Sequence, residues 1–218
     1  GENPDKVFAV GSPAIDAVAK VDFEKKPEVF PDLDMGRPYL VVLAHPVATD
    51  SKEENIKMAT DLILAIKELP LPKIILGSNI DAGSDVLGST IKNWIEKEKP
   101  TDIFFTKHLH PDDFYRYLKY TACAVGNSSS FIREGAFLGT PVVLVGSRQN
   151  KREREINTTE ADISAPGIKS AILGQLRVGR YKQSTMFGDG SAGQKMADVL
   201  SSVNLEVQKI FRDLNEAL

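Results

Sequence analysis

Residues 123–138 read CAVGNSSSFIREGAFL, and this stretch decides how we interpret the fold. Its first residues are apolar and predict a short buried strand, whereas its last residues predict the body of a helix. Small polar residues therefore lie where a strand passes directly into a helix N-terminus. Backbone N–H groups are unpaired there and the helix dipole is positive, so a phosphate group fits. Taken alone, the segment favours the simpler alternative of an ordinary serine N-cap.

Glu134 follows one turn into the predicted helix. Its carboxylate cannot bind a phosphate, but it can accept hydrogen bonds from ribose hydroxyls, as acidic residues near nucleotide-binding loops do.

Strand-like and helix-like segments alternate on both sides of this stretch. Short apolar runs predict strands at residues 7–10, 39–44, 72–76, 102–105, 123–125 and 141–145. Helices are predicted at residues 13–20, after a capping box at Ser51, from Ser84, at 111–120, around 134–138, around 170–176 and at 191–218. Residues 21–37 and 147–162 are charged and predict surface loops. Because strands alternate with helices, we predict an α/β fold with a Rossmann-like, doubly wound parallel sheet.

The composition is that of an ordinary globular protein. The chain has 218 residues, of which 42% are hydrophobic and 26% charged, and we expect residues 1–218 to form one domain. The net charge of −3 argues against nucleic acid or an anionic membrane as a partner. The first residues resemble no signal peptide and lack an initiator methionine, which is consistent with a fragment of a longer chain. Cys123 is the single cysteine, so an internal disulfide is impossible and we expect a reducing, cytoplasmic location. Because Cys123 lies in an apolar run, we expect its side chain to be buried.

The loops that follow the predicted strands are polar. Ligands of doubly wound sheets bind outside the carboxyl ends of the strands, so these loops are the expected site. Every histidine of the chain lies in them, at His45, His108 and His110, and so does Arg148. A single loop histidine is usually solvated or structural, but their shared position makes a ligand contact an equal alternative, with His45 best placed.

Short motifs in these loops, taken together and in order, resemble the UDP-N-acetylglucosamine 2-epimerase family. They are His45-Pro46-Val47, Asn79 to Ser84, Lys107-His108, Gly126 to Ser129, Ile132-Arg133-Glu134, Gly139 to Val142 and Gly146 to Gln149. Each motif is weak alone, but their common order is specific. The hydrolysing branch, which supplies N-acetylmannosamine for sialic acid synthesis, resembles the chain most.

The resemblance implies that the chain is half of an enzyme. Members of the family have two Rossmann-like domains that face each other across a cleft, in the glycosyltransferase-B arrangement. Our chain matches only the C-terminal, nucleotide-binding domain. The missing N-terminal domain, which in the family carries the carboxylates for proton transfer, is an expected partner, and we expect the intact enzyme to be a homo-oligomer.

The resemblance also implies roles for individual residues. The diphosphate would be bound by Ser128 and Ser129 with their backbone N–H groups and by Arg148, and Glu134 would bind the ribose. His45 would be catalytic, stabilising the departing UDP or positioning an acid–base group. The remaining UDP-binding residues would be Asn79, His108, Leu109 at the uracil edge, Asn127 and Ser130.

In the hydrolysing reaction that the resemblance implies, UDP leaves C1 of UDP-N-acetylglucosamine as a proton is removed from C2. Water then adds to the glycal intermediate, and the products are N-acetylmannosamine and UDP. The scheme needs no metal and no cofactor. His45 is followed by proline, as in hydrolysing members, rather than by the basic residues of non-hydrolysing ones.

Several alternatives remain open at this point. They are a non-hydrolysing epimerase, a diacetamido 6-deoxy UDP-sugar as the substrate, a glycosyltransferase of the same architecture, and a UDP-binding module that is catalytically silent when isolated. Feedback regulation by a sialic-acid nucleotide, known in animal members, is not carried over, because Asp85 stands where a basic residue would be expected.

Overall fold

The computed structural model describes residues 2–77, 84–204 and 208. Asn79, which was expected to line the nucleotide pocket, lies outside the described residues. The helices are η1 (Pro4–Lys6), α1 (Pro13–Ala19), α2 (Lys52–Lys67), α3 (Ser84–Glu98), α4 (Pro111–Tyr120), α5 (Ser129–Leu138), α6 (Ala165–Val178) and α7 (Ala192–Ser202). The strands are β1 (Leu40–Leu43), β2 (Lys73–Leu76), β3 (Ile103–Thr106), β4 (Cys123–Gly126), β5 (Val142–Val145) and β6 (Thr158–Ala161).

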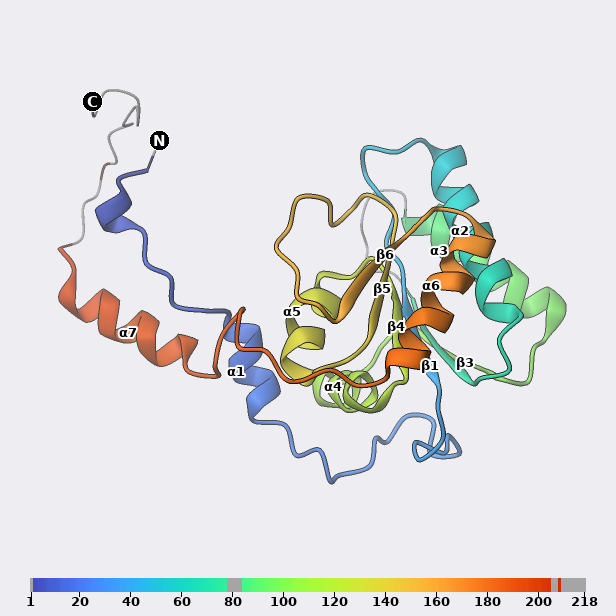
Figure 1. The fold of residues 1–218 in the computed structure, drawn as a ribbon, viewed down its shortest axis with the longest axis horizontal. Coiled ribbons are helices and arrows are strands. Elements are labelled where there is room, and N and C mark those ends of the chain that lie inside the picture. Colours follow the sequence, from blue (N-terminus) through green and yellow to red (C-terminus); the bar gives the residue numbers. More distant parts are fainter. Residues whose placement is uncertain (1, 78–83, 205–207, 209–218) are drawn as a thin grey trace.

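The strands form one parallel sheet (Figure 1). Their order across the sheet is β3-β2-β1-β4-β5-β6, and every neighbouring pair runs parallel. The chain builds one half of the sheet outward from β1, returns to the centre at β4 and then builds the other half. This is the strand order of the doubly wound Rossmann arrangement. The predicted fold class is therefore confirmed.

Helices cover both faces of the sheet. On one face α2, α3 and α6 pack against a cluster that includes Val42, and on the other α1, α4 and α5 pack against a cluster that includes Val41. Neighbouring strand residues point to opposite faces, so a strand covered on both sides is apolar at every position. Cys123 is fully buried in the first cluster, as expected.

Local sequence signals set the start of α2 as predicted. The Ser51 backbone N–H donates to Glu54 Oε2 at 2.7 Å, and the Glu54 N–H donates to Ser51 Oγ at 3.2 Å. These two bonds are the reciprocal pair of a capping box.

The strand predicted at residues 7–10 is wrong. These residues form no strand, and Val7 and Phe8 are exposed. A strand needs a neighbour to complete its backbone hydrogen bonds, and this segment leads from η1 to α1, away from the sheet (Figure 1).

The expectation of a loop throughout residues 147–162 is also wrong, because β6 lies within it. β6 pairs with β5 alone, at the edge of the sheet, and is partly exposed. An edge strand needs no continuous apolar run, so hydrophobicity does not reveal it. The two β-branched residues Thr158 and Thr159 are its only local signal.

A helix was predicted at residues 191–218. α7 covers its first part and ends at Ser202, where Val203 has extended backbone angles of φ −87° and ψ 144°. Most of the residues after Asn204 lie outside the described residues. Val203 and Asn204 are weak helix formers, which favours the end of α7 at this point.

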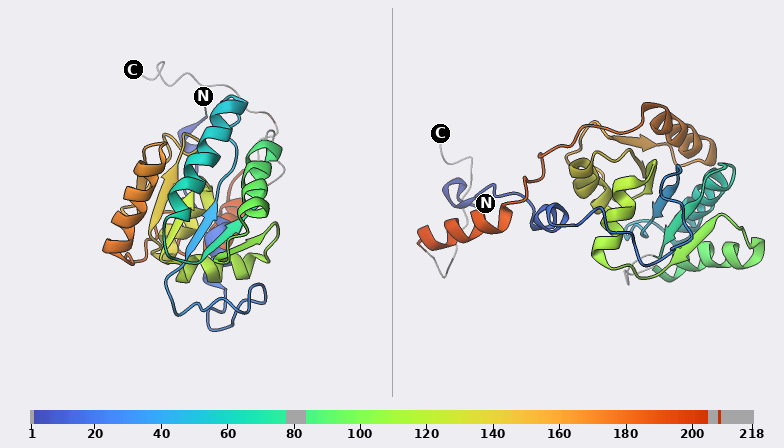
Figure 2. Two further views of the ribbon diagram at one scale, coloured as in Figure 1. Left: turned by 90° about the vertical axis from the view of Figure 1, so that its right-hand side faces the viewer. Right: turned by 90° about the horizontal axis from the view of Figure 1, so that it is seen from below.

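α1 and α7 pack together beside the sheet domain (Figures 1 and 2). Asp16 of α1 accepts the backbone N–H groups of Ala192 at 2.9 Å and Gly193 at 2.7 Å, so it caps the start of α7 from a distant part of the chain. Among the described residues, no helix combines the length and apolarity needed to cross a membrane.

Candidate functional site

The strand order reverses between β1 and β4, and this switch point is where doubly wound sheets bind their ligands. The two strands end very close together here. Gly126 has a φ of +143°, and a Cβ atom on it would lie 2.0 Å from the Leu43 carbonyl oxygen. Only glycine fits this position, because no side chain tolerates both the contact and the backbone angle. The loop after β4 is thereby pressed against the end of β1.

The side chain of Asn127 joins the two loops. Its Oδ1 accepts the His45 backbone N–H at 2.7 Å, and its Nδ2 donates to the His45 carbonyl at 2.8 Å. Asn127 is fully buried. Its amide therefore continues the pairing of β1 with β4 by one residue beyond the sheet.

The rest of the turn after β1 is held by two further side chains. Arg148 Nη1, in the loop after β5, donates to the Pro46 carbonyl at 2.7 Å. Asn55 of α2 accepts the Val47 N–H at 2.8 Å and donates back to the Val47 carbonyl at 3.1 Å. Residues 45–47, which we call the His45 turn, are thus connected to β4, β5 and α2.

A cavity of about 320 Å³ opens at this edge of the sheet. Both polar and apolar residues line it, which suits a ligand that has both a charged and an aromatic part. Its lining residues are Leu43, His45, Leu76, Gly77, Lys107, His108, Leu109, Pro111, Phe114, Ser128 and Ser130.

The N-terminus of α5 borders the cavity. Ser128 is the N-cap, and its Oγ accepts the Ser130 N–H at 3.3 Å. The ordinary capping interpretation is therefore correct for the Ser128 side chain. It does not exclude an anion, because a helix N-terminus presents several backbone N–H groups and a positive dipole.

Glu134 lies one turn further along α5 and is 2% exposed. Its Oε2 lies 3.8 Å from Nε of Arg133, too far for a hydrogen bond, and neither of these buried atoms has a hydrogen-bond partner among the described residues. Burial raises the pKa of the Glu134 carboxyl, while Arg133 and Ser130 oppose that rise. Burial also raises the pKa of Tyr115 on α4, with the Glu134 charge as a further cause.

The structure brings half of the ten predicted residues to one cavity, and Asn79 lies outside the described residues. His45, His108, Leu109, Ser128 and Ser130 line it. The other predicted residues lie apart from its lining: Asn127 is buried under the His45 turn, Glu134 is buried in α5, Arg148 contacts the His45 turn, and Ser129 lines a small separate pocket with Arg133. His110, also considered, caps α4 by accepting the Asp112 N–H at Nδ1.

Sequence reasoning missed two residues that support the site. Asn55 holds the His45 turn, and Gln149, buried at 3% exposure, donates to the Asn127 carbonyl at 2.7 Å. Gln149 belongs to the motif Gly146 to Gln149, but nothing in the sequence was a reason to assign it a role. Asn55 lies in an otherwise ordinary amphipathic helix. A polar residue on the buried face of that helix is the signal that could have revealed Asn55.

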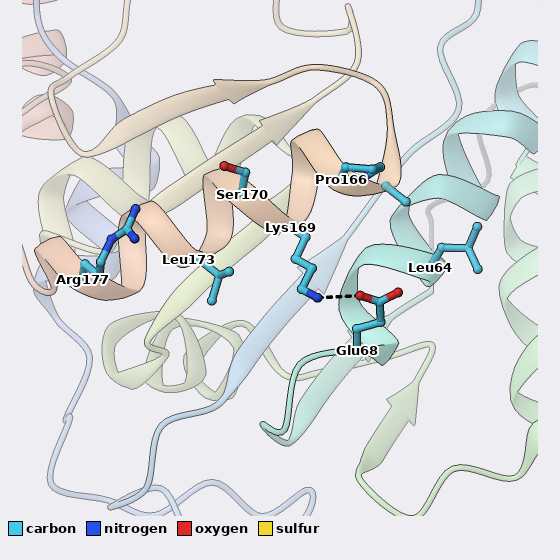
Figure 3. A pocket seen from close by; sticks show the side chains of 8 residues that line it. Leu64, Glu68, Pro166, Lys169, Ser170, Leu173 and Arg177 are labelled. Carbon is cyan, nitrogen blue, oxygen red and sulfur yellow. Dashed lines mark hydrogen bonds and ion pairs between the residues drawn. The ribbon is translucent and has the colours of Figure 1, made fainter.

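A second depression, of about 350 Å³, lies between α2 and α6 (Figure 3). Lys169 reaches across it to Glu68 at 2.5 Å, between Leu64 and Leu173. None of the predicted site residues lines it. The described residues contain no group of three or more histidine, cysteine or acidic side chains suited to a metal ion.

Comparison with known proteins identifies the family. The sequence profile of the UDP-N-acetylglucosamine 2-epimerases matches residues 1–201. The chain belongs to the UDP-N-acetylglucosamine 2-epimerase family. The resemblance seen in the loop motifs is thereby confirmed. A relative in Legionella pneumophila, UDP-N,N'-diacetylbacillosamine 2-epimerase (hydrolyzing), is 29% identical over 95% of this chain and 55% of its own length. The Neisseria meningitidis UDP-N-acetylglucosamine 2-epimerase is 26% identical over 99% of this chain and 58% of its own.

Solved epimerase structures share the fold. The UDP-GlcNAc 2-epimerase from Neisseria meningitidis, bound to UDP-GlcNAc, aligns with a TM-score of 0.71 at 14% identity over 93% of this chain and 57% of its own. The Methanocaldococcus jannaschii enzyme, in complex with UDP-GlcNAc and UDP, aligns with a TM-score of 0.69 at 16% identity over 92% of this chain and 56% of its own. The epimerase-family chain described here spans about half the length of the curated relatives it matches.

Proposed function

We propose that this chain is the UDP-binding domain of a UDP-N-acetylglucosamine 2-epimerase of the hydrolysing type. One observation carries the proposal. The cavity at the switch point combines the N-terminus of α5, at Ser128 and Ser130, with His45 and His108. A helix N-terminus at the switch point of a doubly wound sheet is a general site for nucleotide phosphates.

The diphosphate binds at the start of α5 in this proposal. Ser128 and Ser129 supply backbone N–H groups there, and Arg148 supplies a charge-assisted hydrogen bond from the neighbouring loop. Its existing contact with Pro46, at 2.7 Å, holds the Arg148 side chain beside the His45 turn. Asn127 contributes through its position under the turn, since its side-chain amide already bonds to His45.

The nucleoside binds along α4 and α5. The backbone at Leu109, beside His108, meets the uracil edge, and Phe114 of α4 also lines the cavity. Glu134 binds the ribose after its carboxylate turns away from Arg133. Such a turn is favoured because Oε2 is buried without a hydrogen bond, which is costly for a carboxylate, and ribose hydroxyls supply the missing donors.

His45 assists the departure of UDP from C1 of the sugar. Its imidazole lines the cavity at the end of β1, where it can stabilise the negative charge that develops on the leaving diphosphate. Proton removal at C2 and addition of water to the glycal need carboxylates, which we assign to a second domain of the intact enzyme. Binding energy from uridine and diphosphate would hold C1 and C2 against those carboxylates.

Hydrolysis is favoured over simple epimerisation by two observations. Proline follows His45, as in hydrolysing members, and the Legionella relative is named as a hydrolysing enzyme. That relative's name also favours a second candidate substrate, a diacetamido 6-deoxy UDP-sugar. For either substrate, we propose that the chain binds the UDP-sugar and UDP. We also propose that residues 1–218 form one nucleotide-binding domain and that the intact enzyme is a homo-oligomer.

Calorimetric titration of this 218-residue chain with nucleotides tests the proposal. We expect UDP to bind, with CDP and GDP weaker because the uracil edge is read by backbone groups. We expect no release of N-acetylmannosamine from UDP-N-acetylglucosamine by the isolated chain. Equal affinities for UDP, CDP and GDP would contradict the proposal that the site recognises uridine. Release of N-acetylmannosamine by the isolated chain would contradict the proposal that the catalytic carboxylates lie in another domain.

A further inference from the structure

The His45 turn is held at each of its residues by a side chain from outside it. Asn127 brackets His45 with two hydrogen bonds, Arg148 bonds to the Pro46 carbonyl, and Asn55 brackets Val47 with two hydrogen bonds. β1 ends at Leu43, so the sheet itself no longer supports these residues. Side-chain amides replace the backbone partners that a longer strand would have had.

The two asparagines are themselves fixed. Asn127 is fully buried, and Gln149 Nε2 donates to the backbone carbonyl of Asn127 at 2.7 Å. Asn55 is 6% exposed, and its Nδ2 also donates to the Ser51 carbonyl at 3.0 Å, at the start of α2. Each amide therefore has its acceptor and its donor engaged, and both amides serve the same turn.

We propose that Asn127 and Asn55 are positioning residues, which hold the His45 imidazole at the cavity in the orientation that meets the UDP diphosphate. The inference rests on the proposed function, and it assigns Asn127 a role through His45 in place of a direct contact with UDP. Pre-organisation of a functional side chain by buried, hydrogen-bonded neighbours removes the cost of ordering it when the ligand binds.

Asn157 provides a matched control within the same chain. It is 2% exposed, and its Nδ2 donates to the Thr140 carbonyl at 2.7 Å. Its own carbonyl accepts from Val142 at the start of β5, so it lies at the opposite edge of the sheet from the cavity. An Asn→Asp change at any of the three positions replaces one buried amide donor by an oxygen that faces a carbonyl.

The test compares Asn127→Asp, Asn55→Asp and Asn157→Asp in the 218-residue chain. With only three histidines in the sequence, the ring resonances of His45 and His108 can be followed separately by NMR during a UDP titration. We expect the UDP-induced shift of His45 to fall by about half or more in the first two variants, with UDP affinity weakened roughly tenfold. His108 should keep its shift, and Asn157→Asp should leave both histidines unchanged despite a similar loss of thermal stability.

The outcomes separate the inference from the proposed function. A wild-type chain that binds no UDP removes the proposed function and, with it, this inference. UDP binding with the same His45 shift in all the variants removes the inference alone, as does an equal loss in Asn157→Asp. Should Asn127→Asp fail to fold, Asn55→Asp, which within the turn removes the support of Val47 alone, decides the matter by itself.

Discussion

Oε2 of the Glu134 carboxylate lies 3.8 Å from the guanidinium Nε of Arg133, and these two atoms are buried without a hydrogen bond between them. A carboxylate in this state is costly, because it has lost water without gaining a full partner. The same residue is the one that we assign to the ribose. We interpret the unsatisfied oxygen as binding capacity kept for the ligand, since functional sites often carry such local costs.

Glu134→Gln should therefore bind UDP more weakly. The amide keeps the shape of the side chain but loses the charge that strengthens the hydrogen bonds from ribose hydroxyls. We expect a loss of about 1–3 kcal/mol, the scale of a hydrogen bond to a charged group, for this variant and for Glu134→Ala. Calorimetry measures it, and 2'-deoxy-UDP should show a smaller loss than UDP. Unchanged UDP binding would mean that the ribose lies elsewhere.

The stability of the free chain should depend on pH through Glu134. Burial raises the pKa of this carboxyl above its usual value of 4.5, so the folded state binds its proton more tightly than the unfolded state does. The free energy of unfolding should then fall as pH rises through and above 4.5, relative to Glu134→Gln. Urea denaturation of both proteins between pH 4 and 7 checks this. A stability difference that does not change with pH would contradict the raised pKa.

Arg148→Ala should weaken UDP binding by about 1–3 kcal/mol, because it removes a charged donor to the diphosphate. Arg148→Lys should recover part of the affinity, since it keeps the charge but loses the guanidinium geometry that also reaches Pro46. Calorimetry at two salt concentrations separates these effects. Uridine, which has no phosphate, is the control, and we expect the wild type and both variants to bind it with equal affinity. If the variants lost as much affinity for uridine as for UDP, Arg148 would not contact the phosphates.

Gly126→Ala should destabilise the fold strongly. The new methyl group would lie 2.0 Å from the Leu43 carbonyl oxygen, at a backbone φ of +143°. We expect a loss of about 3 kcal/mol or more, the range of severe steric and backbone changes. Gly174→Ala in α6 is the matched control: nothing lies within 4 Å of its added methyl, so it should stabilise the helix by about 0.5–1 kcal/mol. Thermal unfolding of both variants gives the comparison, and a Gly126→Ala variant as stable as the wild type would show that β1 and β4 can separate at their ends.

Sequence patterns predicted the fold well where the chain is buried on both sides. The strands that became β1, β4 and β5 are continuous apolar runs because helices cover both faces of the sheet. The same signal failed at the margins. Val7 and Phe8 are apolar without a strand to join, and β6 is a strand without an apolar run, since its edge position leaves it partly exposed.

The candidate site was predictable in outline because strand ends in a parallel sheet must share one edge. Its internal geometry was not. The local sequence around Asn127 does not indicate whether its amide faces a ligand or the backbone of His45, 82 residues earlier. That pairing depends on the closeness of β1 and β4 at Gly126, which is a property of the assembled sheet.

A backbone chemical-shift map of the chain on addition of UDP tests the central claim most directly. The claim predicts that the largest shifts fall on the His45 turn, on Ser128 to Ser130 and Glu134 of α5, and on His108 and Leu109, with the α2–α6 depression around Lys169 unaffected. Shifts that gather around Lys169 and Leu173, or the absence of any shift at Ser128 to Ser130, would contradict it.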